Sequence, residues 1–529
     1  MKPIKRGAVK VEWRVCWVPS GRARGGMPDR LLVGWGDLAV REEAVGVRAG
    51  DPIFLSPDYR VDPLLSLYVQ SPGFRRHLVE TKRNYATDIA LLLTFLWSRG
   101  RSWTEAVARD LEDYEHWRLR AAENPVRVGG SKWNRELAAF SGLFAWAVKE
   151  RWITRSPVAT RQVLGRRGEV LAVAVAKAKD SRPSNVHWLT PRTWRLWINV
   201  GLRGHTRQGV PERGWVGRLE DRNVAFTRLV TSSGLRRLEA GSLLTFEIPK
   251  LPLPEGRYCH GRIAAEVTRS KKSRTFYVST GAVGDVESYV DSSRAWAVRQ
   301  AQRAGRYDRL PERRQVTEVT RGTKPMVRWC DQDGVVGERE LARLTWQERM
   351  LLFTEGPDGP EPLWLWLNEQ GLPFHPHSWE GVFRTANQRC ERVLTPPEHL
   401  GRDPHQVFAP YATVHAGRHS FALFMLVVLN EVMDRRYGLT PAERRDFRLL
   451  YGDPWFMVQG LLGHASRETT VETYLAPVRH LQLQSLLADA AAPPGAPMPD
   501  LDSLFARVAR DAEGIQDIDA CMTFAGGSE

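Results

Sequence analysis

Three short segments in the second half of the chain concentrate arginine, histidine and tyrosine, the side chains suited to binding a phosphate group and attacking it. They lie at residues 233–239 (Ser-Gly-Leu-Arg-Arg-Leu-Glu), 415–422 (His-Ala-Gly-Arg-His-Ser-Phe-Ala) and 462–477 (Leu-Gly-His to Tyr-Leu-Ala-Pro). The spacing of the second segment predicts that His415, Arg418 and His419 share one face of a helix, because side chains three and four residues apart are neighbours there.

Together these side chains suit the transfer of a phosphoryl group without a metal ion. A guanidinium group forms paired hydrogen bonds to phosphate oxygens and offsets the charge that develops on them. A tyrosine hydroxyl can act as the nucleophile, and a histidine can transfer protons. The sequence contains neither a carboxylate cluster for two magnesium ions nor a Gly-x-x-x-x-Gly-Lys phosphate loop. It therefore predicts a reaction with no cofactor, no metal and no ATP.

Each of these residues also has an ordinary interpretation. An isolated arginine in a helix is usually solvated or ion-paired, and a tyrosine near a helix end usually packs in the core. His415 and His419, four residues apart, could bind zinc, but the acidic general base of a His-Glu-x-x-His motif and a third ligand are both missing. The functional prediction therefore depends on the whole set and its order.

Taken together and in this order, the segments resemble the tyrosine recombinase (phage integrase) family. The family signature is an arginine in a Gly-Leu-Arg turn, then His-x-x-Arg, then Leu-Gly-His, and then a tyrosine shortly after a Thr-Thr pair, and every part is present. The resemblance extends from Asp62 to His480 and includes a Thr-x-x-x-Tyr-x-x-Asp pattern at Thr81, Tyr85 and Asp88.

The resemblance implies a catalytic role for five of these residues. Arg236 and Arg418 correspond to the two arginines that hold the scissile phosphate. His415 corresponds to the residue that assists proton transfer and phosphate binding, and His464 to the one that hydrogen-bonds the same phosphate. Tyr474 corresponds to the nucleophile that forms a 3′-phosphotyrosyl link, although one extra residue separates it from His464 relative to the commonest family spacing.

The same resemblance assigns supporting roles and a general acid. Glu239 corresponds to the acidic residue that supports the first arginine, and His419 is assigned a structural role. The family's general acid is a lysine in a β-hairpin, and two β-like runs at residues 262–267 and 274–279 predict such a hairpin. Arg269 stands near the usual position of this lysine. Because lysine is scarce after residue 186 and Lys271 and Lys272 lie in the predicted hairpin, Lys271 is predicted to be the general acid, with Lys272 as the alternative.

Composition limits the class of protein and its location. The formal net charge is +15, which indicates either a polyanionic partner such as DNA or the arginine-rich usage of a GC-rich genome. No apolar run approaches the roughly 18 residues that span a bilayer, so we expect no membrane association. The five cysteines are scattered and no apolar signal core follows the basic N-terminus, which predicts a cytoplasmic protein, associated with the nucleoid when it is bound to DNA.

The predicted fold is multidomain and mainly α, with a helical core-binding domain followed by an α+β catalytic domain. Helices are expected near residues 81–96, 103–121 and 131–148, where apolar residues recur at helical spacing. The predicted divisions are an N-terminal appendage of unclear role (1–61), the helical DNA-binding domain (62–160), a linker (161–185), the catalytic domain (186–485) with an insertion near 293–360, and a flexible C-terminal tail (486–529).

The family resemblance also implies the partners. They are double-stranded DNA recombination sites, three further copies of the chain in a homotetramer on DNA, and an accessory DNA-bending or excision factor. The insertion and the long tail favour the integrase of a mobile element. Two alternatives remain open at this point: a type IB topoisomerase that relaxes supercoils, and a noncatalytic DNA-binding relative.

Overall fold

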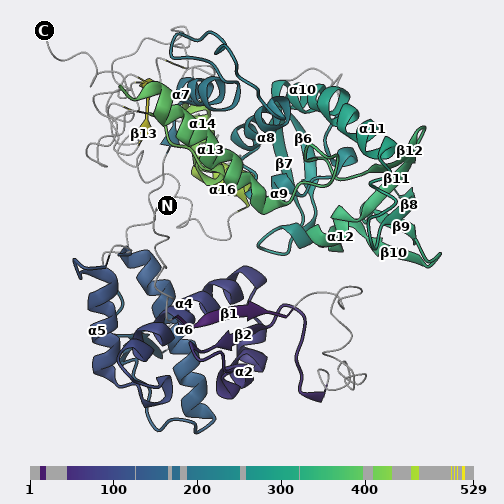
Figure 1. Ribbon diagram of the computed structural model, residues 1–529. Helices are drawn as coiled ribbons and strands as arrows, with labels where there is room; N and C mark the ends of the chain where they lie inside the picture. Colours follow the sequence, from purple (N-terminus) through teal and green to yellow (C-terminus); the bar gives the residue numbers. More distant parts are fainter. Residues whose placement is uncertain are drawn as a thin grey trace, which may run out of the picture. The chain divides into compact units, whose positions relative to one another are not determined.

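The computed structural model describes residues 12–18, 44–124, 127–164, 170–178, 188–250, 258–320, 322–396, 409–431 and 454–463, with residues 502, 505, 506, 509 and 515–518. The chain divides into two compact units, Met1–Asn185 and Val186–Glu529, which are described separately (Figure 1). None of the described helices is long and apolar enough to cross a membrane.

The first unit is mainly helical. Its elements are β1 (Arg14–Trp17), β2 (Pro52–Leu55), α2 (Pro63–Gln70), α3 (Pro72–Arg75), α4 (Val79–Ser98), η2 (Trp103–Glu105), α5 (Ala108–Leu119), α6 (Gly130–Lys149), β3 (Thr160–Leu164) and β4 (Val170–Ala174). The long helices α4 and α6 bury apolar faces that include Leu92, Leu96, Phe140 and Phe144. The predicted three-helix pattern corresponds to α4, α5 and α6, because the apolar residues recur at the spacing that one helix face requires.

Asp88 of the Thr-x-x-x-Tyr-x-x-Asp pattern has a structural role in this unit. Its carboxylate is completely buried and pairs with Lys132 and with Arg135, whose Nε lies 3.1 Å from Oδ2. Because a buried charge is tolerated only when it is paired, this contact fixes α4 against α6.

Two segments outside the helices belong to the first unit as well. The N-terminal strand β1 pairs antiparallel with β2, and Trp13 N–H donates to Thr94 Oγ1 of α4 at 3.0 Å. Residues 161–178, which the sequence predicted to be linker, contain the antiparallel β3–β4 hairpin instead. The stretch after the hairpin packs on α6, since Trp133 Nε1 donates to Ala176 O at 2.8 Å. The linker prediction was therefore wrong here, because it relied on the polar residues of this segment and overlooked the short apolar strand β4 (Val-Leu-Ala-Val-Ala).

The second unit is a mixed α+β domain. Its elements up to the added sheet are β5 (Trp188–Leu189), α7 (Pro191–Trp197), η3 (Ile198–Leu202), α8 (Glu220–Ser233), α9 (Arg237–Gly241), η4 (Thr245–Glu247), β6 (Tyr258–Ile263), η5 (Ala265–Val267), β7 (Arg274–Ser279), α10 (Thr280–Tyr289), η6 (Val290–Arg294) and α11 (Ala295–Arg303). The elements that follow are β8 (Arg314–Val319), β9 (Met326–Asp331), β10 (Val336–Glu340), η7 (Leu341–Arg343), α12 (Trp346–Met350), β11 (Leu352–Gly356), β12 (Gly359–Pro362), η8 (Pro376–Ser378), α13 (Trp379–Leu394), α14 (Val414–Glu431), α16 (Pro454–Leu462) and β13 (Ile515–Gln516).

Aromatic side chains form the centre of the second unit. Phe226 of α8 stacks on Trp379 of α13, with ring centroids 3.5 Å apart, and Trp366 packs edge-on against both rings. All three side chains are buried. This core fixes α8, whose C-terminal end leads into the Gly-Leu-Arg segment.

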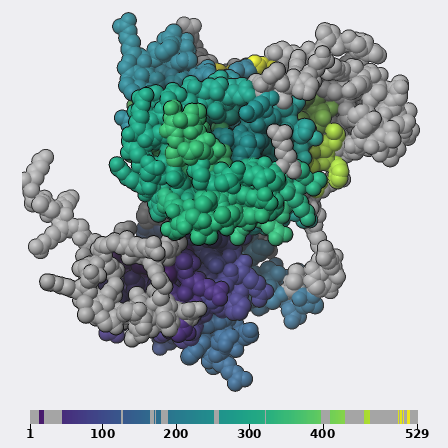
Figure 2. All heavy atoms as spheres, turned by 90° about the vertical axis from the view of Figure 1, so that its right-hand side faces the viewer, coloured from purple at the N-terminus to yellow at the C-terminus, as the bar shows by residue number. Residues whose placement is uncertain are grey.

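The predicted insertion is an ordered part of the second unit. Residues 314–362 form a five-stranded sheet in the order β10-β9-β8-β11-β12, in which only β8 and β11 are parallel. Its charges pair across the strands, since Arg328 of β9 contacts both Glu318 of β8 and Glu338 of β10. The sequence showed no clear periodicity here, because the charged residues of these strands find their partners on neighbouring strands rather than nearby in sequence. Figure 2 shows the teal-to-green segment that carries this sheet covering one face of the second unit.

The C-terminal tail also contributes to the second unit, contrary to the predicted flexible tail. Strand β13 pairs parallel with β5, and Phe505 is buried in a stacked contact with Phe424 of α14. The carboxylate of Asp517 accepts hydrogen bonds from Thr190 Oγ1 at 2.6 Å and from Arg192 Nε at 2.7 Å. The error arose because these contacts join segments that are distant in sequence, so no local pattern signals them. The predicted Ala-Pro-Gly linker at 490–497 lies outside the described residues.

Candidate active site

The turn after α8 positions the first arginine. Helix α8 ends at Ser233, and Gly234 adopts a left-handed conformation with φ of +63°. A Cβ atom at this position would lie 2.3 Å from the Phe421 ring of α14. Glycine therefore meets two requirements at once, the positive φ and the close approach of α14. Arg236 follows as the N-cap of α9, with its side chain 26% exposed.

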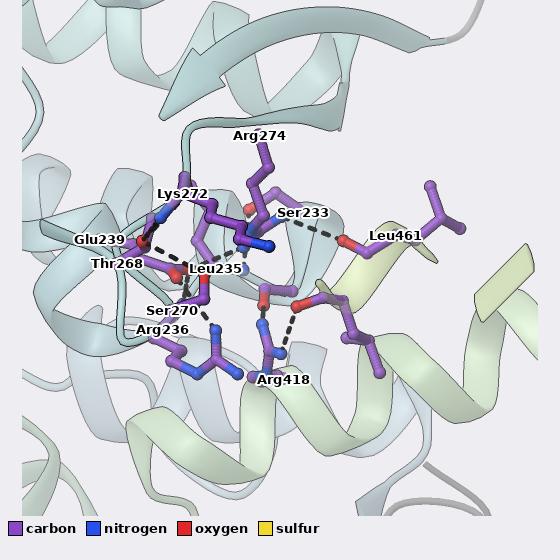
Figure 3. Close-up of polar contacts among 12 residues, drawn as sticks. Ser233, Leu235, Arg236, Glu239, Thr268, Ser270, Lys272, Arg274, Arg418 and Leu461 are labelled. Atoms are coloured by element: carbon purple, nitrogen blue, oxygen red, sulfur yellow. Dashed lines mark hydrogen bonds and ion pairs between the residues drawn. The ribbon is translucent and has the colours of Figure 1, made fainter. Parts of the chain in front are cut away.

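The second arginine reaches the same turn from α14. Gly417 lets α14 approach α8 closely, because a Cβ atom there would lie 2.9 Å from Val230 Cγ1. The completely buried Arg418 donates from Nη1 to Gly234 O and from Nη2 to Leu462 O, the latter at 2.6 Å (Figure 3). Arg418 therefore connects the Gly-Leu-Arg turn with the end of α16.

Glu239 joins the site beneath Arg236. Its buried carboxylate accepts from the backbone N–H of Arg236 at 2.9 Å, from Arg236 Nη1 at 3.0 Å and from Arg274 Nη2 at 2.7 Å. Burial on its own would raise the pKa of Glu239, but the positive charges of Arg274, Arg418 and Arg236 outweigh it and hold the pKa below its ordinary value. Glu239 is therefore ionised at neutral pH and orients one edge of the Arg236 guanidinium.

The two histidines of α14 lie side by side in different surroundings. Their rings are perpendicular, with centroids 4.5 Å apart. His419 is buried against Trp188, and its structural role remains a prediction. His415 keeps solvent access, yet partial burial and the positive charges of Arg418 and Arg236 lower its pKa to about 4. His415 is therefore neutral at pH 7 and able to accept a proton.

The β6–β7 hairpin carries the candidate lysines. The strands pair antiparallel with Ile263 opposite Arg274, so the first predicted strand ends four residues earlier than expected and continues as η5. Lys271 adopts a positive φ of 54°, is 47% exposed, and pairs with the Glu266 side chain and with Glu266 O at 2.9 Å. The Lys272 side chain extends toward the arginine cluster in Figure 3 and forms no ion pair with a described residue.

Arg274 is a member of this cluster that the sequence prediction missed. Its Nη2 contacts Glu239, and its Nη1 donates to Leu461 O of α16 at 3.0 Å. A signal was present in the sequence: Arg274 shares a strand face with Phe276 and Val278, both of which are buried. A charged residue at an inward-facing strand position needs a partner.

The remaining predicted site residues, His464 and Tyr474, lie outside the described residues. The structure follows the third segment as far as Gly463, where α16 has ended and φ is +64°. The structure therefore brings Arg236, Glu239 and Arg418 together and places His415 beside them. The Lys271 side chain, in contrast, contacts Glu266.

Among the described residues, no group of three His, Cys, Asp or Glu side chains is arranged to hold a metal ion. The prediction of a metal-free reaction remains a prediction. The cluster itself presents three arginines and one carboxylate, so its charge suits an anionic ligand.

Comparison with known proteins identifies the helical unit. Residues 75–151, which span α4 to α6, match the family model described as "Phage integrase, N-terminal SAM-like domain". No curated protein matches the sequence. Two solved structures of the XerH site-specific recombinase are similar. The post-cleavage complex with palindromic difH is 12% identical, with a TM-score of 0.39 over 80% of this chain and 83% of that chain. The pre-cleavage complex is 13% identical, with a TM-score of 0.37 over 81% and 83%.

Residues 75–151 of the helical unit therefore resemble the N-terminal SAM-like domain of phage integrases.

Proposed function

We propose that the protein is a site-specific DNA recombinase that cleaves and rejoins DNA through a 3′-phosphotyrosyl link to Tyr474. The observation that carries this proposal is the cluster around Glu239, in which a buried carboxylate holds Arg236 from one side only. The other N–H groups of the Arg236 guanidinium bond to no residue that the structure describes. They are available to a phosphate, and paired guanidinium contacts stabilise the charge of the pentacoordinate transition state.

The proposed reaction is balanced without a co-reactant. The Tyr474 oxygen attacks the scissile phosphorus and gives up its proton, for which the neutral imidazole of His415 is a suitable acceptor. The bond from phosphorus to the 5′-oxygen breaks, and a general acid protonates the departing oxygen. Rejoining reverses these steps with a 5′-hydroxyl of another strand, so the phosphodiester is conserved and no ATP is consumed.

The contacts of the hairpin favour Lys272 over Lys271 as the general acid. Lys271 is held by Glu266, both by its side chain and by its backbone carbonyl. These contacts direct the Lys271 ammonium group toward Glu266 and occupy two of its hydrogen-bond donors. Lys272 extends toward the cluster from the same turn, and Thr268 Oγ1 fixes its backbone by accepting from Lys272 N–H at 3.2 Å (Figure 3).

The proposed partner is double-stranded DNA that carries a recombination site. Four copies of the chain acting on two DNA segments, with an accessory DNA-bending or excision factor, form the assembly that the family implies. The large ordered sheet at residues 314–362 and the docked C-terminal residues suit a mobile-element integrase. A cytoplasmic location follows from this function.

A nicked suicide substrate tests the proposal. The released oligonucleotide cannot return, so a covalent adduct accumulates on the parent protein and is expected to be absent from Tyr474→Phe, which lacks only the attacking oxygen. DNA binding by Tyr474→Phe should equal that of the parent. An adduct on Tyr474→Phe would show that another residue is the nucleophile.

A two-site recombination assay beside a supercoil-relaxation assay separates the alternatives. Recombination between two sites supports the proposal, whereas relaxation without exchange indicates a topoisomerase. Neither activity, with DNA binding intact, indicates a noncatalytic relative.

A further inference from the structure

We propose that Arg274 is a positioning residue of the phosphate site, which holds Glu239 so that Glu239 can orient Arg236 toward the substrate. The inference rests on the proposed function, because the phosphate is that of the DNA substrate. Arg274 would not touch the DNA itself, since its side chain is only 12% exposed and its Nη1 and Nη2 atoms bond to Leu461 O and Glu239.

The division of hydrogen bonds at Glu239 is the first observation. Oε1 accepts from Arg236 Nη1 at 3.0 Å, whereas Oε2 accepts from Arg274 Nη2 at 2.7 Å and from the Arg236 backbone N–H at 2.9 Å. The side chains of Glu239 and Arg274 are 0% and 12% exposed. Without Arg274, the buried carboxylate would lose its shortest contact, and Arg236 would be the arginine that still donates hydrogen bonds to it. Arg236 would then be drawn toward Glu239 and away from the phosphate.

The second observation concerns the chain that leads to His464. Arg274 Nη1 donates to Leu461 O at 3.0 Å, and Arg418 Nη2 donates to the next carbonyl, Leu462 O, at 2.6 Å. A Cβ atom on Gly463 would lie 2.6 Å from Arg274 Cδ. The stem of Arg274 therefore passes directly over Gly463, the residue before His464.

These contacts make Arg274 the link between three predicted site segments. It starts on the hairpin that carries the lysines, supports the Gly-Leu-Arg segment through Glu239, and holds the last turn of α16. A planar guanidinium can make both contacts at once, whereas an ammonium group on a flexible stem cannot hold the two directions. The geometry therefore requires arginine in particular.

The test compares Arg274→Gln and Arg274→Lys in the full chain with a matched control. Arg349→Gln is a suitable control because Arg349 also pairs with a buried carboxylate, Glu247, and also donates to a backbone carbonyl, Ser242 O. Arg274→Gln should slow adduct formation on the suicide substrate by about 10²-fold, the effect of displacing a catalytic group by about 1 Å. The Kd for DNA should stay close to that of the parent. Arg349→Gln should lower the Tm and leave the rate per folded molecule unchanged.

The pH profile separates positioning from a merely structural role. Because Arg274 helps to keep the pKa of Glu239 low, its loss raises that pKa. As the solution is acidified, the rate of Arg274→Gln should therefore begin to fall at a higher pH than the parent rate, whereas Arg274→Lys should keep the parent profile at a reduced rate. A parental rate for Arg274→Gln, or a loss that only follows the folded fraction, would overturn the inference.

Inorganic tungstate, a tetrahedral dianion, provides a readout that does not depend on DNA cleavage. At constant ionic strength, tungstate should raise the Tm of the parent and of Arg349→Gln but not that of Arg236→Ala or Arg274→Gln. If the parent forms no adduct, the proposed function fails, and this pattern alone would still support the role of Arg274. Equal stabilisation of Arg274→Gln and the parent, or no stabilisation of the parent, would refute it.

Discussion

Replacing Glu239 with glutamine tests the electrostatics of the site most directly. The change keeps the shape of the side chain and removes the charge that three arginines surround. A glutamine oxygen can retain one of the present contacts, but its amide group then faces a guanidinium donor at the other. Removing one partner of a buried ion pair destabilises a protein by about 3–5 kcal/mol. Because one contact is retained, we expect about 3 kcal/mol for Glu239→Gln.

Thermal unfolding followed by circular dichroism measures this loss. For large domains 1 kcal/mol corresponds to about 2 °C in Tm, so Glu239→Gln should unfold about 6 °C below the parent at pH 7. The pKa of Glu239 is lowered by folding, so its contribution is fully present above the unfolded pKa of about 4.3 and is lost as pH falls through the folded value. The difference in Tm should therefore shrink below about pH 4.3. Equal Tm values at pH 7, or a difference that persists undiminished in acid, would refute the proposed electrostatics.

Three further predictions concern the reaction. Lys272→Ala should slow cleavage of a normal phosphodiester by roughly 10²–10⁴-fold, as expected for loss of a general acid. A substrate with a 5′-bridging phosphorothiolate should restore the rate of this variant, because its thiolate leaves without a proton. Lys271→Ala should show the smaller defect, and the phosphorothiolate should not restore the rate of Arg236→Ala. The reverse order of the two lysines would return the role to Lys271. Cleavage should continue in excess EDTA, because the proposed charge stabilisation comes from side chains, and an absolute requirement for added magnesium or zinc would contradict it. The pKa of His415 is lowered to about 4, so the cleavage rate should stay constant as pH falls through 6.5 and should decrease only in more acidic solution. A decrease centred on the ordinary histidine pKa would show that His415 is not the proton acceptor.

The sequence predicted the fold class correctly, since helical periodicity marked α4, α5 and α6 and the motifs marked the α+β domain. Local patterns were sufficient for these elements because each depends on residues within one helix or one turn. The Gly-Leu-Arg turn is an example, since the positive φ of Gly234 is a local requirement. The roles of the site residues remain predictions.

The features that the sequence did not reveal depend on contacts between distant segments. The contacts of Arg274 form only when β7, α9 and α16 pack together, and 187 positions separate Arg274 from Leu461 in the sequence. The charged strands of the 314–362 sheet appeared irregular because their partners for pairing lie on neighbouring strands. Asp517 and Phe505 were assigned to a flexible tail for the same reason.

The pairing of β13 with β5 has a consequence for how the protein is made. The bond between Thr190 and Asp517 spans 327 positions, so β5 can pair with β13 only after residues 515–517 have been synthesised. The helical unit has no such dependence on the C-terminus, because its described strands pair within residues 14–174. Domains usually fold in order from the N-terminus during synthesis. A nascent chain can therefore fold its helical unit before β13, which the second unit requires, has been synthesised. A prematurely terminated chain would keep the early domain and leave Trp188 and Phe424 without their covering residues.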